Sequence, residues 1–289
     1  MLNAKPSRTA QRVAVRRAEH KVLDDPKVFE DSLAVAIAGA EAAFELPRSR
    51  EPETMFSRSL RAFLVVRSRY AEDRLTTAVE RGVRQYVVLG AGLDTFAYRN
   101  PLRSAGLHVF EVDHPATQEW KRAQLHDAAI AIPEDMTFAA VDFENQSLED
   151  GLLRAGFEKR QPAFFSWLGV TPYLSRPAFD ATIGFIASMP PGSGLVFDFA
   201  VDRSLLSQSQ QLALDALAER VARAGEPFQL FFDPAALASD LARLGFGNIE
   251  DLNSAQINAR YFAGRSDGLA VSGSGHLLSC ELTKTAQVS

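Results

Sequence analysis

The spacing of apolar positions along the chain changes once, near residue 84. Before that point apolar residues recur at helical spacing, which predicts helices over residues 9–23, 27–43 and 57–81. After it, short apolar runs alternate with amphipathic stretches, a pattern typical of a parallel sheet with helices on both faces. The predicted strands are 86–89, 107–112, 136–140, 163–167, 195–200, 248–252 and 276–282. The predicted helices between them are 93–99, 115–129, 147–155, 176–188, 205–224 and 234–244.

This pattern divides the chain into two parts. Residues 1–84 are expected to form a helical extension or lid, and residues 85–289 an α/β domain with a helical insertion around 205–232. A polar, Gly/Ser-rich stretch over 264–275 joins the last two predicted strands, and no helix of full length fits easily there. An antiparallel pairing is therefore expected at this end of the sheet.

The segment 85–99, with the sequence QYVVLGAGLDTFAYR, carries most of the chemical information. Its apolar run stops at Gly90-Ala91-Gly92, and a helix-like sequence follows. Glycines at such a turn let the backbone approach a ligand closely, because no Cβ lies in the way. The spacing weakens a dinucleotide fingerprint without excluding it, because Thr95 stands where the third glycine or alanine belongs. A phosphate-binding loop is disfavoured, because no lysine follows the glycines.

An acidic residue, Asp113, ends the second predicted strand about 20 residues after the glycines. A carboxylate in this place can accept hydrogen bonds from a ribose diol, which both NAD and S-adenosylmethionine (SAM) carry. A strand-to-helix turn that binds no ligand is the remaining alternative. The spacing alone therefore indicates a nucleotide-like cofactor but does not choose between NAD and SAM.

Composition narrows the range of partners. The chain has 46% apolar and 23% charged residues, which is typical of a globular protein with a substantial core. Its net charge is −5. No basic block with interleaved aromatic residues suggests nucleic-acid binding, and no apolar run is long enough to span a membrane. The N-terminal sequence lacks the apolar core of a secretory signal, so a cytoplasmic location is expected. Cys280 is the single cysteine and the five histidines lack ligand spacing, so no metal site is expected.

Four blocks of sequence occur in an order that matches a known family. They are 87–99 (VVLGAGLDTFAYR), 110–122 (FEVDHPATQEWKR), 141–146 (VDFENQ) and 164–175 (FFSWLGVTPYLS), and the block 66–75 (VRSRYAEDRL) precedes them. In these blocks the chain resembles the leucine carboxyl methyltransferase family in the broad sense, which includes bacterial SAM-dependent methyltransferases and polyketide O-methyltransferases. The resemblance implies a class I SAM-methyltransferase fold, Rossmann-like, with a mostly parallel seven-stranded sheet and an antiparallel last strand.

The resemblance also implies where SAM binds. Gly90 and Gly92 would approach the methionine part of SAM, and Asp113 would hold the adenosine ribose hydroxyls. Asp142 would lie near the exocyclic amine of the adenine, with Phe143 against the ring. The family usually has leucine after this aspartate, and Phe143 keeps the apolar contact.

Two further positions concern the methionine end of SAM. Arg67 would pair with the SAM carboxylate, and a guanidinium suits bidentate geometry there. Leu168 stands where several relatives have a glutamate that contacts the amino end of the cofactor. A backbone carbonyl is the expected replacement for that contact.

The expected reaction is O-methylation of a small molecule or a carboxylate by in-line displacement. A carboxylate acceptor needs no general base, whereas a hydroxyl acceptor does. The sequence does not identify the catalytic residue. Tyr173 is a candidate for steering the acceptor, with a packed aromatic residue as the alternative. His114 has two interpretations, a residue that shapes the turn before Pro115 or a catalytic base. Phe228, Phe231 and Phe232 also have two: they line an acceptor site, or they form a hydrophobic clamp.

Three hypotheses about function follow. The first is a SAM-dependent O-methyltransferase. The second is a nicotinamide-dependent oxidoreductase on a doubly wound sheet, and the third is a SAM-binding module that has lost its activity.

Overall fold

The computed structural model describes residues 8–39, 53–223 and 225–283. Their strands form one seven-stranded sheet in the order β3-β2-β1-β4-β5-β7-β6. The strands are β1 (Gln85–Leu89), β2 (His108–Asp113), β3 (Met136–Ala140), β4 (Ala163–Trp167), β5 (Gly194–Ala200), β6 (Phe246–Leu252) and β7 (Gly275–Leu282). The helices are α1 (Arg8–Leu23), α2 (Ala34–Ala38), α4 (Met55–Glu80), α5 (Phe96–Arg99), α6 (Pro115–Asp127), α7 (Leu148–Arg154), α8 (Arg176–Ala187), α9 (Gln208–Arg223), α10 (Pro234–Arg243) and α11 (Ser254–Tyr261), with short 3-10 turns at η1 (Arg103–Ala105), η2 (Thr171–Tyr173) and η3 (Arg203–Leu205).

The direction of the strands confirms the predicted fold class. Strands β1 to β5 pair in parallel, and β7 pairs antiparallel with both β5 and β6. The chain runs outward from β1 through β2 to β3, and then starts again on the other side of β1 with β4. This reversal leaves a crevice beyond the carboxyl ends of β1 and β4, where α/β proteins bind their ligands.

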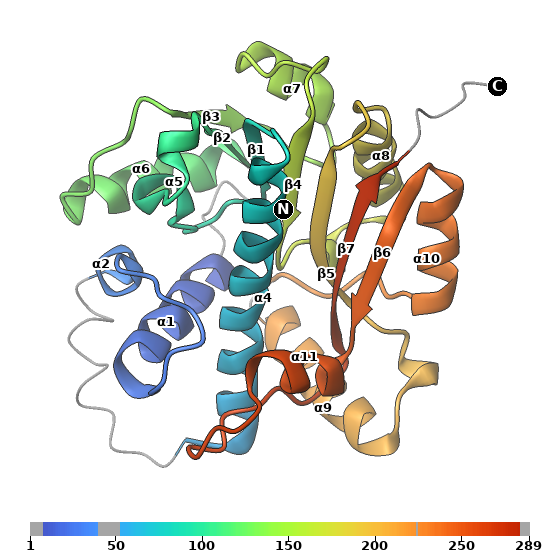
Figure 1. Cartoon of the computed structure of the whole chain (residues 1–289). Helices are drawn as coiled ribbons and strands as arrows, with labels where there is room; N and C mark the ends of the chain where they lie inside the picture. Colours follow the sequence, from blue (N-terminus) through green and yellow to red (C-terminus); the bar gives the residue numbers. More distant parts are fainter. Residues whose placement is uncertain (1–7, 40–52, 224, 284–289) are drawn as a thin grey trace.

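Two hydrophobic cores lie on the two faces of the sheet. The residues of β1 alternate between them: Val87 and Leu89 belong to one core, and Tyr86 and Val88 to the other. The first core is covered by α7, α8 and α10, and the second by α4 and α11 (Figure 1). Because β1 is buried on both faces, its sequence is a continuous apolar run and not an alternating one.

Two local predictions were wrong. Residues 27–33 are not helical, and only α2 forms within the predicted segment 27–43, of which 40–43 lie outside the described residues. The side chain of His20 explains this, because its Nε2 accepts the backbone N–H groups of Val28 (3.1 Å) and Phe29 (3.3 Å). The predicted helix 93–99 begins only at Phe96, whose N–H donates to the Asp94 carboxylate at 2.8 Å.

The connection between β6 and β7 has no helix over 264–275, as expected, but a short helix that was not predicted precedes this stretch. Helix α11 forms directly after β6 and is only eight residues long. It begins at a capping box in which Asn253 accepts the N–H of Gln256, whose side chain in turn accepts the N–H of Asn253. The capping signal was therefore present in the sequence but lay next to a stretch that looked like loop. No helix among the described residues combines the length and apolar character needed to cross a membrane.

A buried ionic network fastens the N-terminal helices to the sheet. Arg17 on α1 pairs with Asp31 and donates to the Thr95 hydroxyl at 2.6 Å. Thr95 donates to Asp31 at 2.9 Å and accepts from Arg99 at 3.1 Å, and Arg99 pairs with Glu72 on α4. Burial alone would raise the pKa of Asp31, but the charges of Arg17 and Arg99 outweigh it and hold this pKa below its ordinary value.

We expect the substitution Asp31→Asn to destabilise the fold strongly. It would leave Arg17 and Arg99 buried without their shared anion, a loss worth about 3–5 kcal/mol of unfolding free energy. Because the pKa of Asp31 is lowered on folding, its contribution is present in full at neutral pH and is lost only on acidification. Urea denaturation at pH 7 measures it.

Glu30→Gln is the matched control. Glu30 is exposed and pairs with Lys21 at 2.7 Å on the surface, so its loss should cost about 0–1 kcal/mol. Equal, small effects of the two substitutions would show that the buried network does not hold the N-terminal helices in place.

Candidate functional site

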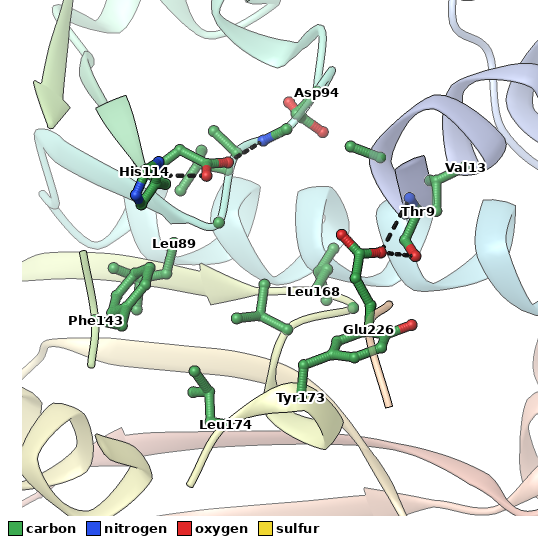
Figure 2. A pocket seen from close by; sticks show the side chains of 18 of the residues that line it. Thr9, Val13, Leu89, Asp94, His114, Phe143, Leu168, Tyr173, Leu174 and Glu226 are labelled. Carbon is green, nitrogen blue, oxygen red and sulfur yellow. Dashed lines mark hydrogen bonds between the residues drawn. The ribbon is translucent and has the colours of Figure 1, made fainter. Parts of the chain in front are cut away.

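A cavity of about 550 Å³ lies at the carboxyl edge of the sheet. Its floor is formed by the segments that follow β1, β2, β3 and β4, and its roof by the start of α1 and the segment 225–229 (Figure 2). The cavity is lined by every residue predicted to bind the cofactor or to steer the acceptor: Arg67, Gly90, Gly92, Asp113, Asp142, Phe143 and Tyr173. The fold thus brings together residues from four strand ends and from α4.

The glycine turn after β1 forms one wall of the cavity. Gly90 (φ +67°) and Gly92 (φ +46°) both lie in the left-handed region that disfavours other residues. A Cβ on Gly90 would lie 2.2 Å from Val170 Cγ2, and one on Gly92 would lie 3.1 Å from Ala10 Cβ on α1. Packing against Val170 and Ala10 therefore leaves room only for glycine at these two positions, and the backbone of the turn borders the cavity without side chains.

Asp113 stands at the end of β2 and braces this turn. Its Oδ2 accepts the N–H of Gly92 at 2.6 Å, and its Oδ1 accepts the N–H of His114 at 2.7 Å. Burial raises the pKa of Asp113, and the two backbone hydrogen bonds oppose the shift. A carboxylate offers about four acceptor positions, so these two bonds leave capacity for a pair of ligand hydroxyls.

His114 has a structural role that the structure makes explicit. Its Nδ1 accepts the N–H of Ala116 at 3.2 Å and so caps the start of α6. A neutral imidazole that accepts at Nδ1 carries its proton on Nε2, which cannot then take a proton from a substrate. Of the two interpretations of His114, the turn residue is the one that this contact supports.

Arg67 reaches the cavity from α4 and lies against the turn after β4. Its Nη1 donates to Asp198 Oδ2 at 3.0 Å, and Asp198 Oδ1 accepts the N–H of Gly169 at 2.5 Å. A Cβ on Gly169 would lie 2.6 Å from Arg67 Nη2, so the guanidinium needs a glycine there. Among the described residues Asp198 is the one hydrogen-bonding partner of Arg67, which leaves most of its N–H groups for a ligand anion.

The adenine end predicted for the cavity lies after β3. The carboxylate of Asp142 accepts the N–H of Glu144 at 3.1 Å and the Asn145 side chain at 2.9 Å. Burial acts to raise the pKa of Asp142, but these hydrogen bonds prevail and lower it. Phe143 is half buried, with its ring centroid 6.5 Å from that of Trp167.

Comparison with known proteins identifies the family. The model of the leucine carboxyl methyltransferase family matches residues 10–187. A Bacillus subtilis protein named "Putative S-adenosyl-L-methionine-dependent methyltransferase YktD" is 32% identical over 279 residues, which cover 89% of this chain and 91% of that protein. A relative from Mycolicibacterium gilvum, named in the same way, is 32% identical over 74% of this chain and 72% of its own length.

The chain belongs to the leucine carboxyl methyltransferase family.

The fold agrees with this membership. A solved structure described as a "putative methyltransferase" from Thermobifida fusca superposes with a TM-score of 0.57 at 18% identity, covering 97% of this chain and 96% of that one. At this level of identity the likeness shows the fold, a class I methyltransferase sheet. Of the two enzyme classes that the glycine turn left open, the family membership favours methyl transfer over nicotinamide chemistry.

The other end of the methyltransferase cavity is lined by aromatic and apolar side chains. Tyr173 lies in η2 after β4, with its ring centroid 5.2 Å from that of Phe228. Phe231 and Phe232 do not line the cavity, and Phe232 instead packs at 4.7 Å against Phe179 in the core. Of the three phenylalanines, Phe228 is the one that lines the cavity. Leu168 is half buried and presents an apolar side chain to the cavity.

Several lining or supporting residues were missed by sequence reasoning. Asp198 is an acid inside a predicted apolar strand and is buried. A buried carboxylate needs a cation as its partner, so this residue could have been recognised from the sequence. Thr9 and Glu226 lie 217 residues apart in the chain and gave no such signal. Glu226 accepts the N–H of Thr9 at 3.2 Å and also its hydroxyl, and this contact closes the roof.

We expect Asp113→Asn to weaken the binding of SAM about 10- to 100-fold, as the loss of hydrogen bonds to a charged acceptor does. Asparagine is isosteric and its one oxygen can still accept the N–H of Gly92, so the fold should persist although the bond from the N–H of His114 is lost. Calorimetric titration with SAM measures the affinity. Asp135→Asn serves as control, because Asp135 lies outside the cavity and pairs with Arg103. An unchanged affinity in Asp113→Asn would show that this acid does not hold the cofactor.

We expect Arg67→Lys to weaken SAM about 10-fold while keeping a cation beside Asp198, because lysine lacks the bidentate fork. Decarboxylated SAM, which has no carboxylate to lose, should bind the variant and the parent protein alike. Titration of both ligands into both proteins tests the pairing. Equal losses for the two ligands would refute it.

Proposed function

We propose that this methyltransferase transfers the methyl group of SAM to an oxygen atom of a small molecule, either a hydroxyl or a carboxylate. The observation that carries the proposal is a single cavity with two unlike ends. One end holds the glycine turn, Asp113 and Asp142, which are suited to a nucleoside with a polar tail. The other end is lined by Tyr173, Phe228 and further apolar side chains, which are suited to an organic acceptor.

The residues of the first end fit SAM. The glycine turn offers a backbone without Cβ atoms, Asp113 has acceptor capacity for ribose hydroxyls, and Arg67 has free donors for a carboxylate. When bound, SAM supplies a methyl group that its sulfonium makes electrophilic. The protein has then to hold the acceptor oxygen in line with that methyl group, and such positioning is worth up to about 7–11 kcal/mol.

The second end fits a small acceptor. The total cavity of about 550 Å³ lies within the size range of small-molecule sites and is roofed by α1 and the segment 225–229. Phe228 and Leu174 provide apolar surface that excludes water from an acceptor. Burial raises the pKa of Tyr173 to about 12, so its hydroxyl stays protonated at neutral pH. Tyr173 can therefore orient an acceptor oxygen through a hydrogen bond, but it is no general base at that pH.

We expect the protein to transfer label from methyl-tritiated SAM to an extractable product when it is incubated with a bacterial metabolite extract. Treatment of the product with mild alkali separates the two acceptor classes, because a methyl ester releases methanol whereas a methyl ether is stable. The Asp113→Asn variant provides the background rate. Binding of SAM without any labelled product would instead favour a module that has lost its activity, and label on nitrogen or carbon would contradict O-methylation.

A further inference from the structure

Five carboxylates line the cavity, and all but one have both oxygens engaged. The four engaged acids are Asp94, Asp113, Asp142 and Glu144, whose oxygens accept hydrogen bonds or meet Arg17. The exception is Glu226. Its Oε2 accepts the N–H and the hydroxyl of Thr9, whereas its Oε1 has no partner among the described residues. Figure 2 shows this second oxygen without a dashed line.

The contact with Thr9 places Glu226 near the glycine turn. Thr9 lies in the first turn of α1, next to Ala10, and the Cβ of Ala10 is the nearest atom to the Cβ that Gly92 lacks. The start of α1 therefore lies over Gly92, and Glu226 lies beside it. The N–H groups at the start of a helix of this length also favour a carboxylate in this place.

Arg67 belongs to the same end of the cavity. Arg67 lies against Gly169, and the next residue, Val170, lies against Gly90, so the guanidinium and Glu226 both lie close to the glycine turn. This end thus presents one cation with free donors and one carboxylate with a free oxygen. A group with both charges, an α-amino acid, complements such a pair: its carboxylate faces the guanidinium and its ammonium faces the acid.

Leu168 makes the assignment more specific. It lies in the turn after β4 and lines the cavity with an apolar side chain, so this position offers no acid to an ammonium. An ammonium carries three donors and no acceptor, so it needs oxygen partners in a partly buried site. Asp198, the other acid nearby, already pairs with the Arg67 cation at 3.0 Å and also accepts the N–H of Gly169.

We propose that Glu226 binds the α-ammonium group of SAM, so that the segment 225–229 supplies the acid that the turn after β4 lacks. This inference rests on the proposed use of SAM but not on the identity of the acceptor. It also gives the contact between Glu226 and Thr9 a role, because one oxygen of the carboxylate holds the roof while the other holds the cofactor.

The test is a titration of two ligands into two proteins. S-adenosylhomocysteine, the demethylated product, carries the amino group, and its desamino analogue has hydrogen in that place. We expect Glu226→Gln to weaken S-adenosylhomocysteine about 10- to 100-fold and to leave the desamino analogue unchanged. Glutamine keeps an oxygen that can accept from Thr9, so the roof contact is retained.

Two further variants keep the result unambiguous. Thr9→Val removes the hydroxyl donor of the roof contact but leaves Glu226, and any loosening of the roof should weaken both ligands by the same factor. Glu219→Gln, on the exposed face of α9, should change neither affinity.

Each remaining outcome bears on one claim. Equal weakening of both ligands by Glu226→Gln, or no weakening of either, would overturn the assignment of Glu226. If the parent protein binds S-adenosylhomocysteine and Glu226→Gln binds it equally well, the use of SAM stands and only this assignment fails. If the parent protein does not bind S-adenosylhomocysteine at all, the proposed function itself is wrong.

Discussion

The position of the cavity roof depends on a buried ionic network. Arg17 on α1, Asp31 before α2, and Arg99 after the glycine turn meet around the hydroxyl of Thr95. Charges buried in this way are costly unless each has its partner, so the network holds only one arrangement of its members. That constraint fixes the N-terminal helices against the segment that follows β1, and with it the roof of the cavity.

The network also explains part of the sequence motif. In the block G-A-G-L-D-T-F-A-Y-R, the glycines form the turn that borders the cavity. The side chains of Asp94, Thr95 and Arg99 instead form contacts that hold neighbouring elements of the fold. Thr95 and Arg99 bind the N-terminal helices and α4, and Asp94 starts α5 and faces Arg17 at 3.7 Å. The motif thus joins two tasks: one half shapes a ligand site and the other half fastens the elements that cover it.

Much of the fold could be predicted because its signals are local. Each central strand is a short apolar run, and the glycine turn and the acid after β2 are read from spacing alone. The predictions failed where a side chain competed with the backbone. His20 takes the N–H groups of Val28 and Phe29, which prevents the helix that the apolar spacing favoured. The Asp94 carboxylate likewise delays the start of α5.

The sequence by itself determined the sheet, the glycine turn and the acid beside it, because apolar periodicity, left-handed glycines and strand-end carboxylates act within a few residues. Only the tertiary structure decided which distant groups meet. The pair Arg67 and Asp198 is 131 residues apart in the chain, and Thr9 and Glu226 are 217 apart. No local pattern encodes such pairs, because their members meet only in the tertiary structure, where the sheet and α1 bring them together.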